Sequence, residues 1–232
     1  MHVFRHLFLS TLIMFTPVCV LAEESADVDP WEGFNRAMFS FNDTLDRYAL
    51  RPVARGYQAI TPDIVEAGVS NFFDNLSDIG SMLNNLLQLK GNAAGQDLGR
   101  VLFNSTVGLG GLIDVATPMG LPEHNEDFGQ TLGYWGMDTG PYLVLPLFGP
   151  SNIRDGIGLI PDAMVDPVGE VDPIRTRNQL RALRIIDTRA GLFPAEQLLT
   201  GDRYTSMRDS YMQRREFLVN DGKAAAFDED QF

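Results

Sequence analysis

The sequence predicts a single, mostly α-helical domain, and three observations support this fold class. Apolar residues recur at the three- and four-residue spacing of an amphipathic helix along much of the chain. Strand-like alternation of apolar and polar residues never persists for more than a few positions. A length of 232 residues with an apolar fraction of 44% suits a globular chain of one domain or two, and it excludes wholesale disorder.

The first 22 residues are organised as a secretory signal peptide. A basic start without acids precedes an uncharged stretch over 7–22. This stretch is shorter than the roughly 20 residues that a spanning helix needs. Because Val20-Leu21-Ala22 ends in the small residue that signal peptidases prefer, we expect cleavage between Ala22 and Glu23. A short acidic leader then occupies residues 23–28.

Cys19 offers an alternative processing site, because lipoprotein signals end in a small residue followed by a cysteine that is lipidated. Val18 is bulky at the position where Gly or Ala is preferred. We therefore expect Cys19 to be removed with the signal peptide instead of carrying lipid.

The first helix of the mature chain is expected to begin at Asp29-Pro30-Trp31-Glu32. Asp29 is placed to cap it, Pro30 suits the first helical position, and Glu32 completes a capping box. The apolar residues that follow have helical spacing, and Pro52 should end the helix. The stripe consists of Trp31, Phe34, Met38, Phe41, Leu45 and Tyr48.

Five further helices follow from the same spacing. They are expected from Thr61-Pro62 onward, over 79–89, from Asn92 onward, over 174–192 and over 195–217. In the helix from Asn92 we expect Leu98, Val101 and Leu102 to be buried. The last residues, 220–232, are acidic and lack periodicity, which is typical of a mobile tail.

Two uncharged stretches interrupt the helical pattern. Residues 101–113 are rich in glycine, and residues 139–153 contain three prolines and two glycines. Neither is long enough to cross a bilayer as a helix. They are either buried connections within a helical core or apolar surface that faces lipid.

Composition excludes several classes of function. A formal net charge of −13 argues against nucleic-acid binding and against electrostatic attachment to anionic lipid. One cysteine excludes a disulfide framework and a cysteine-rich zinc site. After signal removal only His124 remains, so we expect no metal site, no serine–histidine catalytic site and no cofactor. Carboxylate pairs such as Asp162/Asp166 or Asp187/Asp202 leave a hydrolase open as the alternative.

Several sequence stretches, in this order along the chain, carry a family resemblance. They include Asp29-Pro30-Trp31-Glu32-Gly33-Phe34-Asn35-Arg36, Arg51-Pro52-Val53-Ala54, Asn84-Asn85-Leu86-Leu87-Gln88, Arg100-Val101-Leu102-Phe103-Asn104-Ser105-Thr106, Asp127-Phe128-Gly129-Gln130-Thr131-Leu132-Gly133 and Asp187-Thr188-Arg189-Ala190. Over residues 29–219 the chain resembles the VacJ/MlaA family of Gram-negative bacteria, which supplies the outer-membrane component of the Mla phospholipid-transport system.

The resemblance implies a ring-like helical domain in the inner leaflet of the outer membrane, with an amphipathic channel at its centre. It also implies three partners: phospholipid, a trimeric outer-membrane porin and a soluble periplasmic carrier. Mislocalised phospholipid of the outer leaflet would pass through the channel to that carrier, which maintains lipid asymmetry. The family's lipidation signal is poor here, which puts lipidation of Cys19 in doubt.

On this basis we expect a passive lipid conduit, and we assign its path to two segments. The first is on the initial helix, where Phe34, Asn35, Phe41 and Asn42 combine amide and aromatic groups. The second is the uncharged stretch at 140–148, represented by Tyr142, Leu143, Leu145 and Leu147. The competing possibility is a periplasmic hydrolase of lipids or glycans that uses carboxylates.

Overall fold

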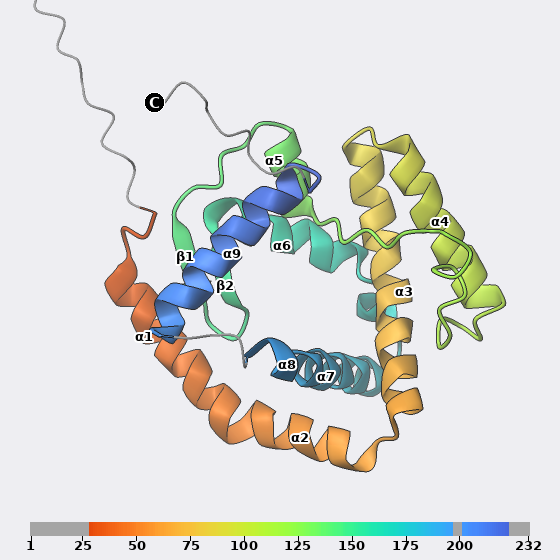
Figure 1. Cartoon of the computed structure of the whole chain (residues 1–232), viewed down its shortest axis with the longest axis horizontal. Coiled ribbons are helices and arrows are strands. Elements are labelled where there is room, and N and C mark those ends of the chain that lie inside the picture. The colour runs from red at the N-terminus through yellow and green to blue at the C-terminus, as the bar shows by residue number, and fades with distance from the viewer. Residues whose placement is uncertain (1–27, 197–200, 223–232) are drawn as a thin grey trace, which may run out of the picture.

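The computed structural model describes residues 28–196 and 201–222 (Figure 1). The predicted signal peptide with Cys19 and the Ala22/Glu23 cleavage site lies outside the described residues, as does most of the acidic tail. The described chain is mostly α-helical, as the sequence predicts. Its elements are α1 (Glu32–Leu45), the π-helical η1 (Asp46–Leu50), α2 (Arg51–Ile60), α3 (Asp63–Leu87), α4 (Gly91–Thr106), α5 (Phe128–Tyr134), β1 (Tyr142–Leu145), β2 (Gly149–Asn152), α6 (Ile153–Val165), the 3-10 helix η2 (Pro167–Glu170), α7 (Ile174–Gly191), α8 (Phe193–Glu196) and α9 (Arg203–Val219).

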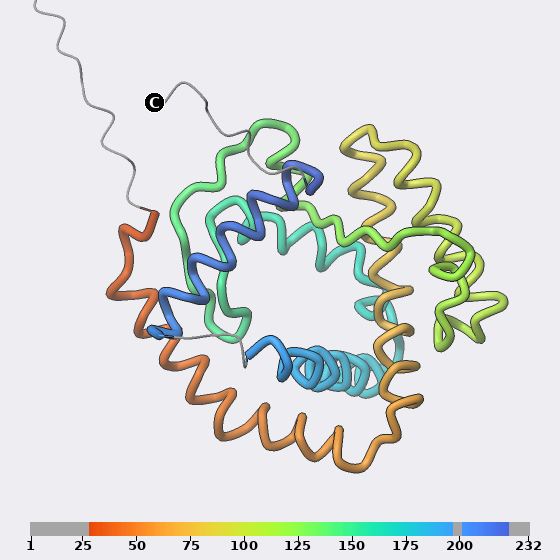
Figure 2. The backbone as a smooth tube through the Cα atoms, viewed as in Figure 1, coloured from red at the N-terminus to blue at the C-terminus, as the bar shows by residue number. Residues whose placement is uncertain are grey.

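The elements follow a closed circuit around a centre (Figures 1 and 2). α1, η1 and α2 form one curved arc, α3 turns upward from its end, and α6 with the β1–β2 hairpin closes the circuit. α4 packs on the outer side of α3, and α9 crosses β2. α7 is seen nearly end-on inside the circuit, where it contacts α2 and α3.

Pro52 does not end the first helix, contrary to the sequence prediction. Between α1 and α2 the helix widens to a π-turn, in which the N–H of Arg51 bonds to the carbonyl of Asp46. Because this wide turn resets the hydrogen-bond register, Pro52 lies in the first turn of α2, where its missing N–H costs nothing. The chain therefore continues as an arc from residue 32 to residue 60.

Asp29 does not cap α1 either. The residue before the helix is Trp31, which makes no side-chain cap bond. Asp29 is buried, and its carboxylate accepts hydrogen bonds from the Asn35 amide, at 2.7 Å, and from the Tyr204 hydroxyl. A buried carboxylate needs such donors more than an exposed helix end needs a cap, and the bonds join α1 to α9.

The other predicted helices are present but differ in extent, and α5 and α6 were not predicted from the sequence. The expected start at Thr61-Pro62 is confirmed, but the helix that begins there runs unbroken to Leu87 and absorbs the segment predicted at 79–89. α7 matches the helix predicted at 174–192. The helix predicted at 195–217 is replaced by α8 and α9, with 197–200 outside the described residues.

The uncharged stretches form turns and a hairpin. α4 extends to Thr106, and turns follow through residue 113. Residues 142–152 form the antiparallel β1–β2 hairpin, in which Tyr142 pairs with Asn152 and Leu145 with Gly149. Each strand has only four residues, which is too short to produce a visible alternation in the sequence.

Burial in this fold is inverted relative to a water-soluble protein. Among the described residues, nine buried residues are apolar and twenty are polar or charged. Large apolar side chains instead cover the outside. Leu98 and Leu102, which we expected to be buried, are 46% and 55% exposed. Within the described ranges, no helix combines the length and hydropathy needed to cross a membrane.

The α3–α4 interface shows why the prediction for α4 was wrong. The two helices meet through polar faces, with Asp97, Arg100 and Asn104 of α4 turned inward. The Arg100 guanidinium bonds to the Asp78 carboxylate at 3.0 Å, and both side chains are 2% exposed. Helical spacing identifies two opposite faces but does not decide which of them is buried.

A small apolar core lies where α1, the hairpin and α9 meet. Tyr142, Val144 and Tyr204 are buried there, and Met38, Phe39, Tyr211 and Met212 pack around them. The rings of Tyr142 and Tyr204 meet edge-to-face with centroids 6.2 Å apart. This cluster fixes the hairpin against the start of the arc.

We predict that Arg100→Met lowers the free energy of unfolding by about 3–5 kcal/mol, because it leaves the Asp78 carboxylate buried without its charged partner. Denaturant titration of the detergent-solubilised chain measures this loss. The double variant R100M/D78L removes both charges and should recover most of it. A single variant within about 1 kcal/mol of wild type would contradict the assigned role of the pair.

Candidate functional site

A cavity at the centre of the circuit is the strongest candidate for a functional site. It has a volume of about 480 Å³, is open to the outside, and is lined by α3, the segment before α5, the tip of the hairpin, α6, η2 and α7. We call it the ring cavity. Its lining consists of Leu76, Ser77, Gly80, Glu126, Asp127, Phe148, Leu159, Asp162, Ala163, Val165, Asp166, Pro167 and Arg184.

A smaller space of about 140 Å³ adjoins the ring cavity toward the hairpin and α9. The two share Asp127, Phe148, Leu159 and Asp162 in their walls. The smaller space adds Leu145, Pro150, Ser151, Asp155, Tyr211 and Arg215. The shared residues therefore form the boundary between the two spaces.

The ring cavity has an amphipathic wall. Leu76, Leu159 and Val165 give it apolar surface, and Phe148 extends this surface from the hairpin tip, where it is 75% exposed. Carboxylates and one guanidinium, that of Arg184, lie in the same wall. Arg184 bonds to Asp166 at 3.2 Å and to the Ser77 hydroxyl at 2.9 Å. Such a wall suits a ligand that has both an apolar and a charged part.

Arg215 of α9 holds one side of the site together. Its guanidinium bonds to both oxygens of Asp127, at 2.5 and 2.8 Å, and to Asp155 at 2.9 Å. The Tyr211 hydroxyl donates a further bond to Asp155 at 2.8 Å. One guanidinium thus joins α9 to the start of α5 and to α6, and its charge offsets that of Asp127.

Glycine is required at the contact between α5 and α6. A Cβ atom on Gly129 would lie 2.5 Å from an oxygen of Asp155, and one on Gly158 would lie 2.6 Å from the backbone nitrogen of Gly129. No side chain fits either place without displacing backbone or a buried ion pair. The two glycines therefore set how closely the helices approach beside the cavity.

Asp162 and Asp127 lie close together but titrate differently. Burial, reinforced by the negative charge of Asp127, raises the pKa of Asp162 to about 6, although the backbone N–H of Phe128 donates to its carboxylate. Burial also opposes ionisation of Asp127, but the bonds from Arg215 prevail and lower its pKa. The cavity therefore holds one carboxylate that stays ionised and one that takes a proton near pH 6.

The predicted residues Asn35 and Asn42 support the hairpin. Asn35 is fully buried; its amide donates to the carbonyl of Tyr142 at 3.0 Å and accepts from the N–H of Val144 at 2.8 Å. One heptad later, Asn42 donates to the carbonyl of Leu145 at 2.9 Å and accepts from the N–H of Leu147 at 2.8 Å. Two side-chain amides thus bind the edge of β1 as a neighbouring strand would.

The other predicted residues are distributed over both sides of the wall. Tyr142 is fully buried in the apolar core, and Leu145 reaches the smaller space beside the ring cavity. Leu143 is partly buried. Phe34, Phe41 and Leu147 lie on the outer surface with at least half of each side chain exposed. The predicted lipid path along these residues stays a prediction.

Several cavity residues were missed by the sequence reasoning. Leu76 and Arg184 lie within predicted helices and carry no local signal of function, and Leu159 lies on α6, which was not predicted. Phe148 lies within the segment predicted at 140–148, although it is not one of the four residues named there. Of the carboxylate pairs considered, Asp162 and Asp166 both line the cavity.

The other carboxylate pair, Asp187 and Asp202, is not brought together. Asp187 accepts from the hydroxyls of Tyr57 and Ser70. Asp202 instead caps α9 through the N–H of Tyr204.

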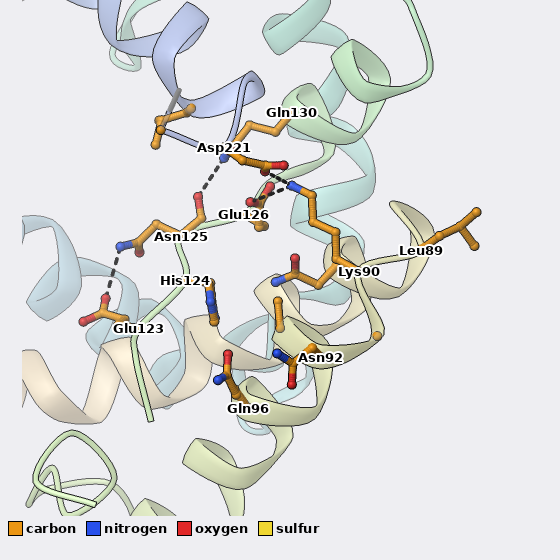
Figure 3. A pocket seen from close by; sticks show the side chains of 15 residues that line it. Leu89, Lys90, Asn92, Gln96, Glu123, His124, Asn125, Glu126, Gln130 and Asp221 are labelled. Carbon is orange, nitrogen blue, oxygen red and sulfur yellow. Dashed lines mark hydrogen bonds and ion pairs between the residues drawn. The ribbon is translucent and has the colours of Figure 1, made fainter. Parts of the chain in front are cut away.

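A second, larger pocket of about 690 Å³ lies outside the ring, between the α3–α4 turn, the 123–126 loop and the end of α9 (Figure 3). His124 points into it, with its Nδ1 2.6 Å from the fully buried Asp97. Lys90 reaches across the pocket to Glu126 and Asp221. Within the described ranges, no group of three or more histidine, cysteine or acidic side chains is placed to hold a metal ion.

Comparisons with known proteins agree with one another. The model of the MlaA lipoprotein family matches residues 27–218. The intermembrane phospholipid transport system lipoprotein MlaA of Escherichia coli is 36% identical over 202 residues, which cover 84% of this chain and 80% of the relative. An uncharacterized protein of Rickettsia felis is 46% identical over 127 residues, or 55% of this chain, and the match spans only about half of that relative (51%).

The fold has a counterpart among solved structures. A structure described as the structural basis for maintenance of bacterial outer membrane lipid asymmetry matches with a TM-score of 0.73 and 36% sequence identity. The match covers 84% of this chain and 100% of that chain. The fold of this chain therefore has been observed experimentally in a related protein.

We predict that Asp162→Asn changes how stability depends on pH. Because the folded-state pKa of Asp162 is raised to about 6 from its ordinary value of 3.8, the folded chain holds this proton more tightly than the unfolded chain. The wild-type free energy of unfolding should therefore fall as the pH rises from about 4 to about 6. At pH 7 the variant's free energy of unfolding should exceed that of wild type by about 1–2 kcal/mol, once solvent screening is included. At pH 4 the two free energies should be equal.

Denaturant titration at several pH values measures the effect. Asp74 and Asp78, whose pKa values burial also raises to about 6, are common to both chains and cancel in the comparison. The exposed Asp138→Asn removes the same charge and serves as the control. Parallel pH profiles for wild type and Asp162→Asn would refute the assignment.

Proposed function

Because the chain belongs to the MlaA lipoprotein family, we propose that it works in intermembrane phospholipid transport and maintains the lipid asymmetry of the outer membrane. The observation that carries this proposal is the amphipathic ring cavity inside a protein whose large apolar side chains face outward. Apolar outer surface suits a lipid environment, and a partly charged interior suits a head group.

In this mechanism the two ends of a phospholipid use different parts of the cavity wall. Acyl chains lie against Leu76, Phe148 and Leu159, while the head group meets Asp166 and Arg184. The chain moves its substrate without breaking a bond, and a downstream acceptor draws the lipid onward by exchange.

The hairpin positions the apolar rim of the cavity. Its tip carries Leu147 and Phe148, and Asn42 binds the strand just before the tip. Loss of the Asn42 amide would release the tip without opening the core around Tyr142. Asn42 is therefore a positioning residue for the lipid path.

We propose further that the protein lies in the inner leaflet of the outer membrane and works with a porin trimer and a periplasmic carrier. The exposed apolar residues of the α1–α2 arc, including Phe34 and Phe41, support a place in the inner leaflet of the outer membrane. A porin trimer would cover part of this apolar surface, and a soluble periplasmic carrier would receive the lipid. Cleavage before Glu23 would leave the mature chain without an acyl anchor, and the mass of its N-terminus distinguishes this from lipidation at Cys19.

A hydrolase is the second candidate, and one observation favours it. Asp162, with its raised pKa, lies beside the ionised Asp127, and such a pair can serve as general acid and base. Against this, Asp127 is bound on both oxygens by Arg215, which leaves it a weak base.

We predict that deleting the gene in its host raises the phospholipid content of the outer leaflet. We also expect that labelled phospholipid remains intact when it is incubated with the purified protein. Normal outer-leaflet lipid in the deletion strain would contradict the transport role. Release of labelled fatty acid or head group, lost in Asp162→Asn, would establish the hydrolase instead.

We predict opposite outcomes for the two asparagines of α1. Asn35→Ala removes buried bonds to β1 and should lower the free energy of unfolding by about 2–4 kcal/mol. Asn42→Ala acts at the partly exposed tip and should cost only about 1 kcal/mol, yet it should alter outer-leaflet lipid. The exposed Asn92→Ala, at the start of α4, is the control. If Asn42→Ala changes stability alone, the positioning role is wrong.

A further inference from the structure

α7 is strongly basic in an otherwise acidic protein. Between Ile174 and Gly191 it carries five arginines and a single acid, Asp187, whereas the whole chain has a formal charge of −13. Arg189 at its C-terminal end is paired with Asp46 and Glu196. Of the four arginines before it, Arg184 pairs with Asp166, and no acidic partner among the described residues is seen for the other three.

Three of these arginines share one face of the helix. Arg177, Arg181 and Arg184 are separated by four and three residues, which aligns their side chains along the axis. We call them the arginine stripe. Arg175 lies on the opposite face, by the same geometry. The stripe spans about 10 Å along a helix that runs through the ring along the viewing direction of Figure 1.

The stripe begins inside the ring cavity and ends outside it. Arg184 is part of the cavity wall, where it bonds to Asp166 and Ser77. Arg177, at the other end, donates to the backbone carbonyl of Gly169 at 2.9 Å. Neither Arg177 nor Arg181 lines the ring cavity.

Arg181, in the middle, is exposed and makes no hydrogen bond or ion pair with the residues that the structure describes. Its guanidinium lies over Gly169 of η2, where an added Cβ would be only 3.7 Å away. A side chain longer than that of glycine would begin to cover the stripe at this point. The guanidinium is therefore exposed beside this backbone and open to a ligand.

We propose that the arginine stripe is the exit path for the phosphodiester group of a phospholipid that leaves the ring cavity. Three guanidinium groups of like charge lie in a row with a single acidic partner among the described residues, Asp166, which pairs with Arg184. Phosphate oxygens match the planar fork of each guanidinium. The head group passes from Arg184 to Arg181 and Arg177, exchanging one guanidinium for the next. This inference rests on the proposed transport function and names the part of the lipid that the chain recognises.

The test uses the full chain in a non-ionic detergent and dihexanoylphosphatidylglycerol as the probe, with binding followed by ³¹P NMR line broadening. Arg181→Gln should weaken binding about five- to tenfold, because one charge-assisted contact is lost. Since Arg181 has no other polar partner, the variant should melt like wild type. Arg175→Gln removes the same charge from the opposite face and should bind within about twofold of wild type.

Three results would overturn the proposal, and they are distinguishable. If Arg181→Gln binds the lipid as well as Arg175→Gln does, the stripe plays no part, while the transport function stands. If inorganic phosphate at the same concentration displaces the lipid, the stripe is a site for free phosphate. If the wild-type chain binds no lipid, the transport function fails together with the stripe.

Discussion

The structure depends on one constraint: its buried polar groups must find partners inside the chain, because the large apolar side chains are outside. The hydrophobic effect in water does not account for such an arrangement. The interior is held instead by ion pairs and amide bonds, such as Arg100 with Asp78 and Arg215 with Asp127 and Asp155. Removing one partner of a buried pair would lower the free energy of unfolding far more than losing a surface contact. The ring geometry is therefore highly specified.

The same constraint shapes the cavity. Because Arg215 binds α9 to the start of α5 and to α6, the charged wall of the cavity is part of the framework that closes the ring. The apolar wall comes partly from the hairpin, whose edge is bound by Asn35 and Asn42. Amides suit this task, since each supplies a donor and an acceptor at strand spacing.

The sequence predicted the helices whose periodicity is strong, but not α5 or α6. It identified the family through ordered stretches such as Asp127-Phe128-Gly129-Gln130. It was wrong about orientation, since the spacing of Leu98 and Leu102 is the same whether the surroundings are water or lipid. It also missed the π-turn before Pro52, in which the N–H of Arg51 bonds to the carbonyl of Asp46. The cavity residues Arg184 and Leu159 come from separate helices, and only the tertiary structure brings them together.

A conduit must bind its cargo well enough to admit it and weakly enough to release it, and the wall of the ring cavity suits both demands. Asp127 adds little repulsion for a phosphate, because Arg215 already neutralises it. Asp162 is protonated for part of the time near pH 6, which lowers the negative charge that a head group meets. Arg184 is engaged with Asp166, so a phosphate gains that guanidinium only by competing with a carboxylate. Binding in the cavity is thereby kept shallow, and under the proposed exit path the unpaired Arg181 outside the cavity offers the phosphate a guanidinium without that competition.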